Sequence, residues 1–170
     1  MCGIFGIAGN NQQKISPSHT QAMLDALSSR GPDANGIKLF DKCTLGHNRL
    51  SIIDLSSGQQ PMLDNKKDLS ITFNGEIYNY KELRARLETL GHTFSTESDT
   101  EVILKSYIEF GTDCPKYLDG MFAFAIWDND SESLFLARDR FGKKPLYYCK
   151  DKENNLLFAS EIKAFLESNI

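Results

Sequence analysis

The sequence predicts a largely antiparallel α/β protein of the α+β kind, in which helices cover multi-stranded sheets. Short apolar segments recur in neighbouring pairs separated by turn residues, a pattern that is typical of antiparallel hairpins. Segments with helical spacing interrupt these pairs without the regular β-α-β alternation of a doubly wound parallel sheet. The chain has 170 residues, enough for one domain whose core needs no disulfide or metal to stabilise it.

The N-terminal part of the chain is predicted to contain a helix among several strands. CGIFGIA, residues 2–8, is a short apolar segment closed by a Gly-Asn pair, which predicts a buried strand. A helix is predicted to begin after Ser16, which is followed by proline, and to stop at RGPD, residues 30–33. NGIKLF and CTLGHNRLSII, residues 35–40 and 43–53, are predicted strands.

The middle of the chain is predicted to form a strand followed by two helices. DLSITFNG, residues 68–75, reads as a strand that ends in Asn-Gly. YKELRARLETLG, residues 80–91, places leucines on one helical face and ends in glycine, which favours a helix stop. A second helix is predicted from Thr100 to about Glu109, with Ser98 or Asp99 near its start.

The C-terminal part is predicted to form two antiparallel strand pairs. GMFAFAIWD, residues 120–128, is strongly apolar and is followed by the turn sequence DNDSES and the returning strand LFLAR, residues 134–138. PLYYC and LLFAS, residues 145–149 and 156–160, form the second predicted pair.

Charge and cysteine content exclude several classes of partner. The formal net charge is -4 and the longest basic runs are Lys-Lys pairs, so we expect no nucleic-acid partner. No apolar run approaches the ~20 residues that span a bilayer, and no secretory signal is present, so we expect a soluble, cytoplasmic protein without a membrane partner. The widely spread cysteines contain no C-x-x-C pair and predict neither a disulfide framework nor a metal site: Cys2, Cys43, Cys114 and Cys149.

The opening segment MCGIFGI places a cysteine directly behind the initiator methionine. Because aminopeptidases remove methionine before a small residue, Cys2 is expected to become the N-terminus. A thiol and an α-amine on one residue could then supply both a nucleophile and a base, since an α-amine titrates near ~8. The alternative is that Cys2 is a small buried hydrophobe, as free cysteines usually are.

Other polar residues occur where predicted strands and helices begin or end. Arg49 has a planar guanidinium suited to a bidentate hold on a carboxylate, and its alternative role is a surface charge or an internal ion pair. Asn74 and Gly75 could direct an amide and a backbone N–H at a developing oxyanion, or could simply form a hairpin turn. Asp99 could hold a substrate ammonium or satisfy free amides at a helix start.

Longer motifs extend over essentially the whole chain and resemble a known family. In this order they resemble the N-terminal glutaminase domain of glutamine-hydrolysing asparagine synthetase, a class II glutamine amidotransferase domain. The longer motifs favour this branch over the sugar-phosphate and purine-pathway relatives that share the opening. The motifs are MCGIFGI, RGPD, GHNRLSIIDLSSGQQPM, FNGEIYNYKELRARL, SDTEVIL, GMFAFAIWD, ARDRFGKKPLYY and FASEIKAF.

This resemblance implies the N-terminal-nucleophile hydrolase fold, a four-layer αββα sandwich with two stacked, mainly antiparallel sheets. It implies that Met1 is removed, that Cys2 is the catalytic nucleophile and that Asn74 and Gly75 form the oxyanion hole. RGPD resembles the family's mobile loop near the glutamine site. Asn48 departs from the family pattern before the arginine, with little expected consequence. The residues implied to bind glutamine are Arg49, Leu50, Ile52, Asn74, Gly75, Glu76 and Asp99.

The activity implied by the resemblance is hydrolysis of L-glutamine to glutamate and ammonia through a Cys2 thioester. No metal or organic cofactor is expected for this half-reaction. The ammonia would pass to an ATP-dependent synthetase domain or subunit that converts aspartate to asparagine, and ATP and Mg are expected only there. Residues 1–170 are predicted to be the glutaminase domain, and because no phosphate-binding loop occurs in them, the synthetase domain is expected to be absent from this chain.

Several alternatives stay open at this point. The domain could serve another acceptor, such as a sugar or a different carboxylate, and it could form a homodimer. It could be a non-catalytic glutamine-binding regulatory module, although the presence of Cys2, Asn74 and Gly75 argues against this. It could also be an N-terminal-nucleophile hydrolase of other amides, although Arg49 and Asp99 favour a free amino acid.

Overall fold

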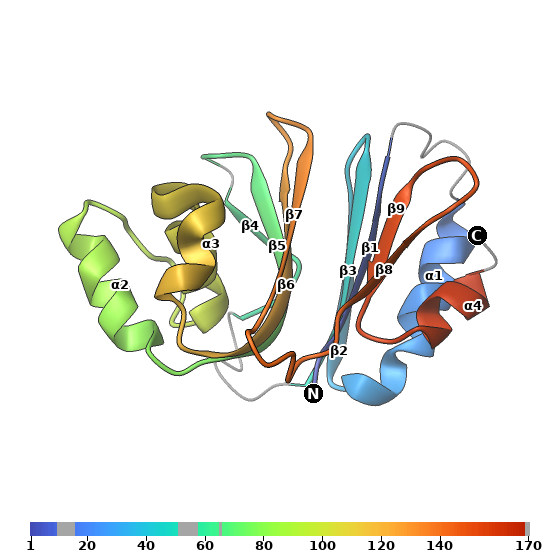
Figure 1. Cartoon of the computed structure of the whole chain (residues 1–170), viewed down its shortest axis with the longest axis horizontal. Helices are drawn as coiled ribbons and strands as arrows, with labels where there is room; N and C mark the ends of the chain where they lie inside the picture. The colour runs from blue at the N-terminus through green and yellow to red at the C-terminus, as the bar shows by residue number, and fades with distance from the viewer. Residues whose placement is uncertain (10–15, 51–57, 65, 169–170) are drawn as a thin grey trace.

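Two antiparallel sheets stack face to face at the centre of the molecule, and helices cover the outer face of each sheet (Figure 1). The computed structural model describes residues 1–9, 16–50, 58–64 and 66–168. The layers follow the order helix, sheet, sheet, helix, which confirms the αββα sandwich expected from the sequence motifs. No helix in these described ranges is both long and apolar enough to cross a membrane.

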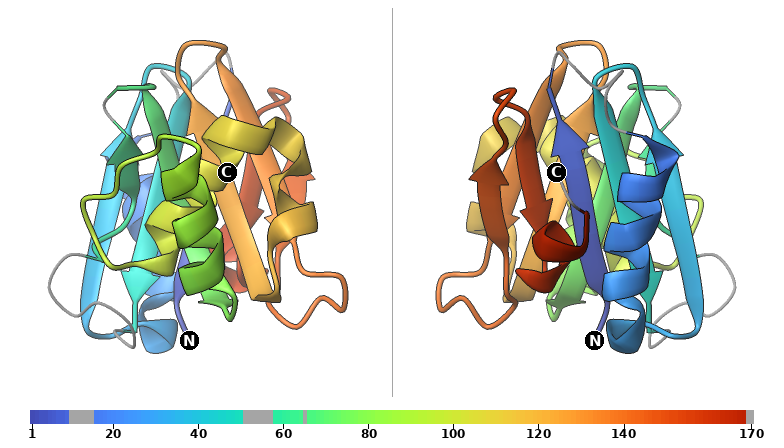
Figure 2. Two further views of the ribbon diagram at one scale, coloured as in Figure 1. Left: turned by 90° about the vertical axis from the view of Figure 1, so that its left-hand side faces the viewer. Right: turned by 90° about the vertical axis from the view of Figure 1, so that its right-hand side faces the viewer.

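The first sheet contains five strands in the order β2-β3-β1-β9-β8, and all neighbours are antiparallel. Helices α1 and α4 pack on its outer face, where Figure 2 shows them side by side. The elements of this half are β1 (Gly3–Ala8), α1 (Pro17–Ala26), the short 3-10 helix η2 (Ser28–Arg30), β2 (Ala34–Leu39), β3 (Cys43–Arg49), β8 (Tyr147–Lys150), β9 (Leu156–Ala159) and α4 (Lys163–Ser168).

The second sheet contains four strands in the order β4-β5-β6-β7, again all antiparallel. Helices α2 and α3 cover its outer face. The elements of this half are β4 (Met62–Asp64), β5 (Leu69–Ile77), α2 (Tyr80–Thr89), α3 (Asp99–Phe110), the 3-10 helix η3 (Gly111–Tyr117), β6 (Gly120–Asp128) and β7 (Ser133–Arg138).

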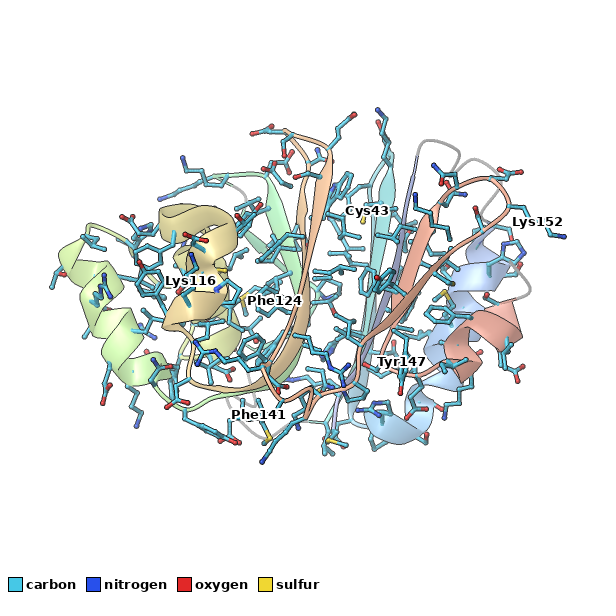
Figure 3. All side chains as sticks on the ribbon, in the orientation of Figure 1. Cys43, Lys116, Phe124, Phe141, Tyr147 and Lys152 are labelled. Carbon is cyan, nitrogen blue, oxygen red and sulfur yellow. The ribbon has the colours of Figure 1, made fainter. Side chains whose placement is uncertain are left out.

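Alternation along the strands divides the apolar residues among separate layers. In β6, Phe124 and Ile126 pack with the buried leucines of α2 and the apolar face of α3. The intervening Ala123, Ala125 and Trp127 face the other sheet, where they pack with residues of β1, β3 and β9. The middle layer combines these alanines with the larger Trp127 and Phe158, whereas Phe124 lies on the helix side of the second sheet (Figure 3).

Most predicted elements are confirmed, and the differences are local. The strand predicted to end in Asn-Gly instead continues to Ile77, where it still pairs with Gly120 of β6, so the hairpin-turn interpretation of Asn74 and Gly75 is wrong. Helix α3 begins at Asp99 with Ser98 as its cap, whose side chain accepts a hydrogen bond of 3.1 Å from the Thr100 N–H. The short elements β4, η3 and α4 were not predicted. The predicted strand 43–53 is confirmed to residue 49, and its residues 51–53 lie outside the described ranges.

We expect Phe124→Ala to lower the free energy of unfolding by about 3–5 kcal/mol, because the ring is fully buried and its removal leaves a cavity. Phe141→Ala is the matched control, since this ring is 89% exposed and its loss should change stability by less than about 0.5 kcal/mol. Urea denaturation of both variants measures the difference. Equal effects of the two substitutions would contradict the placement of Phe124 in the core.

Candidate active site

Strand alternation directs the predicted polar residues of β5 into the space between the sheets. Thr72 Oγ1 donates a hydrogen bond of 3.0 Å to the carbonyl oxygen of Gly46 on the facing sheet. Because side chains alternate along a strand, Asn74 and Glu76 lie on the same face of β5 as Thr72. Both residues therefore face the other sheet at the end of the strand.

The facing sheet presents its own predicted residues in the same way. The His47 ring lies 3.1 Å through Nε2 from the Phe73 carbonyl oxygen of β5, so Arg49, two residues further, lies on the same inward face of β3. Ile4 of β1 packs in the layer between the sheets, and Cys2 precedes it by two residues. The two sheets thus bring Cys2 and Arg49 towards Asn74.

One pocket is lined by these residues together with Met1. It therefore lies at the end of the sandwich where the chain begins, which Figure 1 marks with the letter N. It encloses about 620 Å³, part of which is open to solvent. Ile52 lies outside the described residues. All other predicted site residues line this pocket: Cys2, Arg49, Leu50, Asn74, Gly75, Glu76 and Asp99.

Cys2 is held on both its side chain and its backbone. Its Sγ accepts a hydrogen bond of 3.4 Å from the Leu50 N–H and lies 3.6 Å from the Leu50 carbonyl oxygen. Burial raises the pKa of the thiol, while the contact with Leu50 and the positive charges of the N-terminal amine, Arg49 and Lys144 act to lower it. The thiol is therefore fixed in position, and burial outweighs the groups that favour its ionised form.

Arg30, the first residue of the RGPD motif, anchors the start of the chain. Its Nε donates a hydrogen bond of 2.9 Å to the Cys2 carbonyl oxygen, and its Nη1 forms an ion pair of 2.8 Å with Glu161. The Asp33 N–H of the same motif donates to the Arg49 carbonyl oxygen at 3.0 Å. The motif therefore contacts two residues that line the pocket, and it braces Cys2 and the end of β3.

Asn74 provides a buried donor without a partner. The side chain is 1% exposed, and its Nδ2 has no hydrogen-bond partner in the described part of the chain. A buried amide without a partner is costly, and in natural proteins such groups often serve a ligand. The Asn74 amide is thus available to an acceptor that enters the pocket.

Gly75 is required by strand packing. A Cβ at this position would lie 2.2 Å from the Met121 carbonyl oxygen and 2.8 Å from the Phe122 Cα, both on the neighbouring strand β6. Only glycine lets β5 pass this close to β6 without displacing backbone. The glycine therefore holds Asn74 and Glu76, its neighbours in β5, at the pocket wall.

Asp99 and Arg49 supply opposite charges to the same pocket. Asp99 is 5% exposed at the first turn of α3, and its Oδ2 accepts a hydrogen bond of 3.1 Å from the Ile77 N–H. Burial, with a smaller contribution from the Glu76 charge, raises the pKa of Asp99 to about 6. Arg49 is 7% exposed. A zwitterion with a carboxylate and an ammonium matches these two side chains in charge.

The sequence pattern of the glutamine amidotransferase domain matches residues 1–170. The chain belongs to the glutamine amidotransferase domain family. This confirms the class II glutamine amidotransferase interpretation of the motifs. The N-terminal-nucleophile fold is supported by a solved structure of glutamine phosphoribosylpyrophosphate amidotransferase from Bacillus subtilis. The two chains are 26% identical and superpose with a TM-score of 0.80, and the match covers 99% of this chain and 44% of that chain.

The curated relatives of this amidotransferase domain include several asparagine synthetases. Glutamine-hydrolysing asparagine synthetase 3 of Bacillus subtilis is 45% identical over 98% of this chain and 27% of that protein. Glutamine-hydrolysing asparagine synthetase 3 of Arabidopsis thaliana is 42% identical over 96% of this chain and 28% of that protein. The similarity to asparagine synthetases expected from the longer motifs is confirmed, and the chain spans little more than a quarter of these relatives.

Sequence reasoning missed Gln60, which lies in the wall of the same pocket. Its Oε1 accepts a hydrogen bond of 2.6 Å from the Phe73 N–H, and its Nε2 donates to Thr100 Oγ1 at 3.3 Å. Gln60 thereby joins β5 to the start of α3 and so places Asn74 relative to Asp99. The motif GQQPM contains this residue, but nothing in the local sequence indicates a contact with either element.

Sequence reasoning also missed Lys144, a lysine of the KKPLYY motif that is only 6% exposed. Its Nζ lies 3.3 Å from the Met1 Sδ, and both residues line the pocket.

His47, by contrast, has a structural role: burial lowers its pKa to about 4, so the ring is neutral at pH 7. Within the described ranges, no group of three or more His, Cys, Asp or Glu is placed to hold a metal ion.

The raised pKa of Asp99 predicts a pH dependence of stability. Between about pH 4 and pH 6 the folded protein keeps a proton on Asp99, whereas the unfolded chain, with a pKa near 3.8, has released it. The free energy of unfolding therefore falls as the pH rises through this range. The loss should be on the order of 2 kcal/mol and should be absent in Asp99→Asn. Denaturation across this pH range measures it.

The control for this experiment is Asp130→Asn, which changes an exposed carboxylate in the turn after β6 and should follow the wild-type profile. The readout is the difference between each variant and the wild type at each pH. Parallel profiles for the wild type and Asp99→Asn would show that burial does not raise the pKa of Asp99.

Proposed function

We propose that this domain hydrolyses L-glutamine to glutamate and ammonia, with the Cys2 thiol as nucleophile after removal of Met1. The observation that carries the proposal is the buried, unpartnered Nδ2 of Asn74 in the wall of the pocket that also holds the thiol. A donor kept without a partner beside a nucleophile is what stabilisation of an oxyanion requires.

Glutamine is proposed to bind with its charged end between Arg49 and Asp99. The planar guanidinium of Arg49 donates two hydrogen bonds to the α-carboxylate, and the ionised carboxylate of Asp99 accepts from the α-ammonium. Glu76, with the chain at Leu50 and Ile52, completes this part of the pocket. The γ-amide then extends towards Cys2, whose position is fixed by Leu50 and Arg30.

The first half of the reaction forms a thioester. The α-amine of Cys2, directly or through a water, takes the thiol proton, and the sulfur adds to the γ-amide carbon. Asn74 and Gly75 donate hydrogen bonds to the resulting oxyanion, and the loss of one such donor typically costs about 3 kcal/mol of barrier. The protonated α-amine of Cys2 then gives its proton to the amide nitrogen of glutamine, the C–N bond breaks and ammonia leaves.

The second half releases glutamate. The α-amine takes a proton from water, whose oxygen adds to the thioester carbon, and the C–S bond breaks as the thiol regains its proton. Nucleophile, base and oxyanion donors all come from the chain, so the proposed half-reaction needs no metal or organic cofactor. A reducing cytoplasm suits this chemistry, because the thiol must stay free.

The ammonia is proposed to pass to an ATP-dependent synthetase domain or subunit outside residues 1–170. There aspartate would accept it to give asparagine, and ATP and Mg would be required for that step. The printed names of the curated relatives, and the share of their length that this chain leaves uncovered, support this assignment. A sugar or another carboxylate remains the alternative acceptor. The fixed thiol and the free Asn74 donor favour chemistry over a purely regulatory glutamine-binding module.

Ammonia release from L-glutamine tests the proposed reaction directly. The measurement uses chain whose intact mass shows that it begins at Cys2. We expect turnover by this chain, and a fall of at least about a thousandfold in Cys2→Ala, because the nucleophile is lost. Chain with one extra residue before Cys2 should be equally inactive, because its α-amine is displaced from the thiol.

Cys149→Ala is the matched control for this experiment, since Cys149 is an exposed, free cysteine outside the pocket, and it should keep wild-type turnover. No ammonia from the processed wild type at saturating glutamine would contradict the proposed function. Full turnover by the extended chain would contradict only the role of the α-amine as the base and would leave the proposed reaction standing.

Binding separates the substrate contacts from the chemistry. Cys2→Ser should bind glutamine almost as tightly as the wild type while turnover is nearly lost. The double variant Cys2→Ser, Arg49→Met should bind glutamine about ten- to a hundredfold more weakly than Cys2→Ser, since a hydrogen-bonded charge pair contributes roughly 1.5–3 kcal/mol. Arg140→Met, at an exposed arginine, is the control. Calorimetry with unchanged affinity in the Arg49 variant would refute the carboxylate assignment.

A further inference from the structure

The loop after β7 is built around one buried carboxylate. Asp139 is 7% exposed and accepts four backbone hydrogen bonds: from Phe122 at 3.2 Å, Phe141 at 3.1 Å, Lys143 at 2.9 Å and Lys144 at 3.0 Å. Although burial acts to raise it, these N–H groups hold the pKa of Asp139 below its ordinary value. The carboxylate thus fixes the loop to the start of β6, which itself lines the pocket.

Arg138 fixes the same loop from the other side. Its Nε donates to the Lys144 carbonyl oxygen at 2.8 Å, and its Nη2 donates to the Gly142 carbonyl oxygen at 2.6 Å. Lys144 is therefore held through both its N–H and its carbonyl group. Its side chain turns inward to the pocket, whereas the neighbouring Lys143 is exposed. This arrangement holds one particular lysine against the site.

The ammonium group of Lys144 has little compensation for its burial. Within the described residues it forms no ion pair, and its one hydrogen-bond partner is the Met1 thioether at 3.3 Å, a weak acceptor. Buried charges are normally paired, so an ammonium in this setting indicates an anion that forms or binds nearby. Removal of Met1 takes the thioether away and leaves the pocket as the surroundings of the ammonium.

The other charged groups around Cys2 are already assigned. Arg30 is paired with Glu161, and the charge of Arg49 is neutralised by the substrate carboxylate in the proposed complex. Glu76 and Asp99 line the pocket as acids. Among the described side chains of the pocket, Lys144 is the cation left to act on Cys2 once glutamine is bound.

We propose that Lys144 is an electrostatic activator of Cys2, whose ammonium stabilises the thiolate and the negative charge that develops during attack on the amide. Its role as an activator of turnover rests on the proposed glutaminase function, whereas its effect on the thiol does not. The residue acts through Cys2 and transfers no proton, so it is a positioning residue of the reaction.

Alkylation of Cys2 by iodoacetamide tests this inference without any turnover. The thiolate displaces iodide, so the rate at each pH follows the ionised fraction of the thiol. Peptide mass spectrometry of chain that begins at Cys2 measures the modification of the N-terminal peptide, and exposed Cys149 in the same sample is the internal reference. In Lys144→Met the midpoint for Cys2 should move up by roughly 0.3 pH units or more, which is about a twofold loss of thiolate below the midpoint.

Two further variants isolate the charge from the packing. Lys144→Arg keeps the charge and should stay close to the wild-type midpoint, and Lys143→Met, at the exposed neighbour, should not change it. If Lys144→Met does not fold, Lys144→Gln makes the same neutral comparison. Equal midpoints for the wild type and the neutral variant would overturn the proposal, and so would equal shifts in the neutral variant and Lys144→Arg.

The pH profile of kcat/KM for glutamine carries the inference to the reaction. Its acid limb should move to higher pH in Lys144→Met and should return towards the wild type in Lys144→Arg. A shift in alkylation without a shift in kcat/KM would overturn the role of Lys144 in turnover. A wild-type chain that releases no ammonia would defeat the proposed function, while the alkylation experiment would still decide whether Lys144 acts on the thiol.

Discussion

The pairing of β1 with β3 is the constraint on which the rest of the pocket depends. Gly3 pairs with Asn48 in this antiparallel register, so the next step along the ladder places Cys2 opposite Arg49 and beside Leu50. A slip of one residue would turn the inward face of one of the two strands outward and would separate the thiol from the pocket. The fit of Phe5 over its partner Gly46, where a Cβ would lie 2.0 Å from the ring, opposes such a slip.

The second constraint is the placement of one sheet on the other. Among the described residues, buried polar contacts across the layer between them include Thr72 to the Gly46 carbonyl oxygen and His47 to the Phe73 carbonyl oxygen. Apolar packing alone would allow the sheets to slide, since dispersion contacts are not directional. Because these buried hydrogen bonds lie close in sequence to Arg49 and Asn74, they fix the two halves of the pocket where precision matters. A neutral His47 performs this role without placing a second buried charge beside Arg49.

The sequence predicted the residues of the site that lie in recognisable motifs, and its alternation patterns predicted most strands and helices around them. Asn74 and Gly75 show the limit of local reasoning, because Asn-Gly is a strong turn signal and only pairing with β6 extends the strand through it. Gln60 and Lys144 could not be assigned from their neighbours in sequence. Their positions follow from hydrogen bonds to distant elements, Phe73 for Gln60 and the Asp139 and Arg138 groups for the Lys144 backbone.

Burial works against charge throughout this pocket, and the proposed substrate relieves that cost. The pKa values of both Cys2 and Asp99 are raised by burial, so the empty pocket disfavours the two anions that the reaction needs. An α-ammonium beside Asp99 restores its ionised form, and an α-carboxylate on Arg49 balances that cation. The bound zwitterion adds no net charge, which leaves the field of Lys144 to act on the thiol. Substrate binding and nucleophile activation are thereby divided between different cations, Arg49 from the end of a strand and Lys144 from a loop held by its own buried carboxylate.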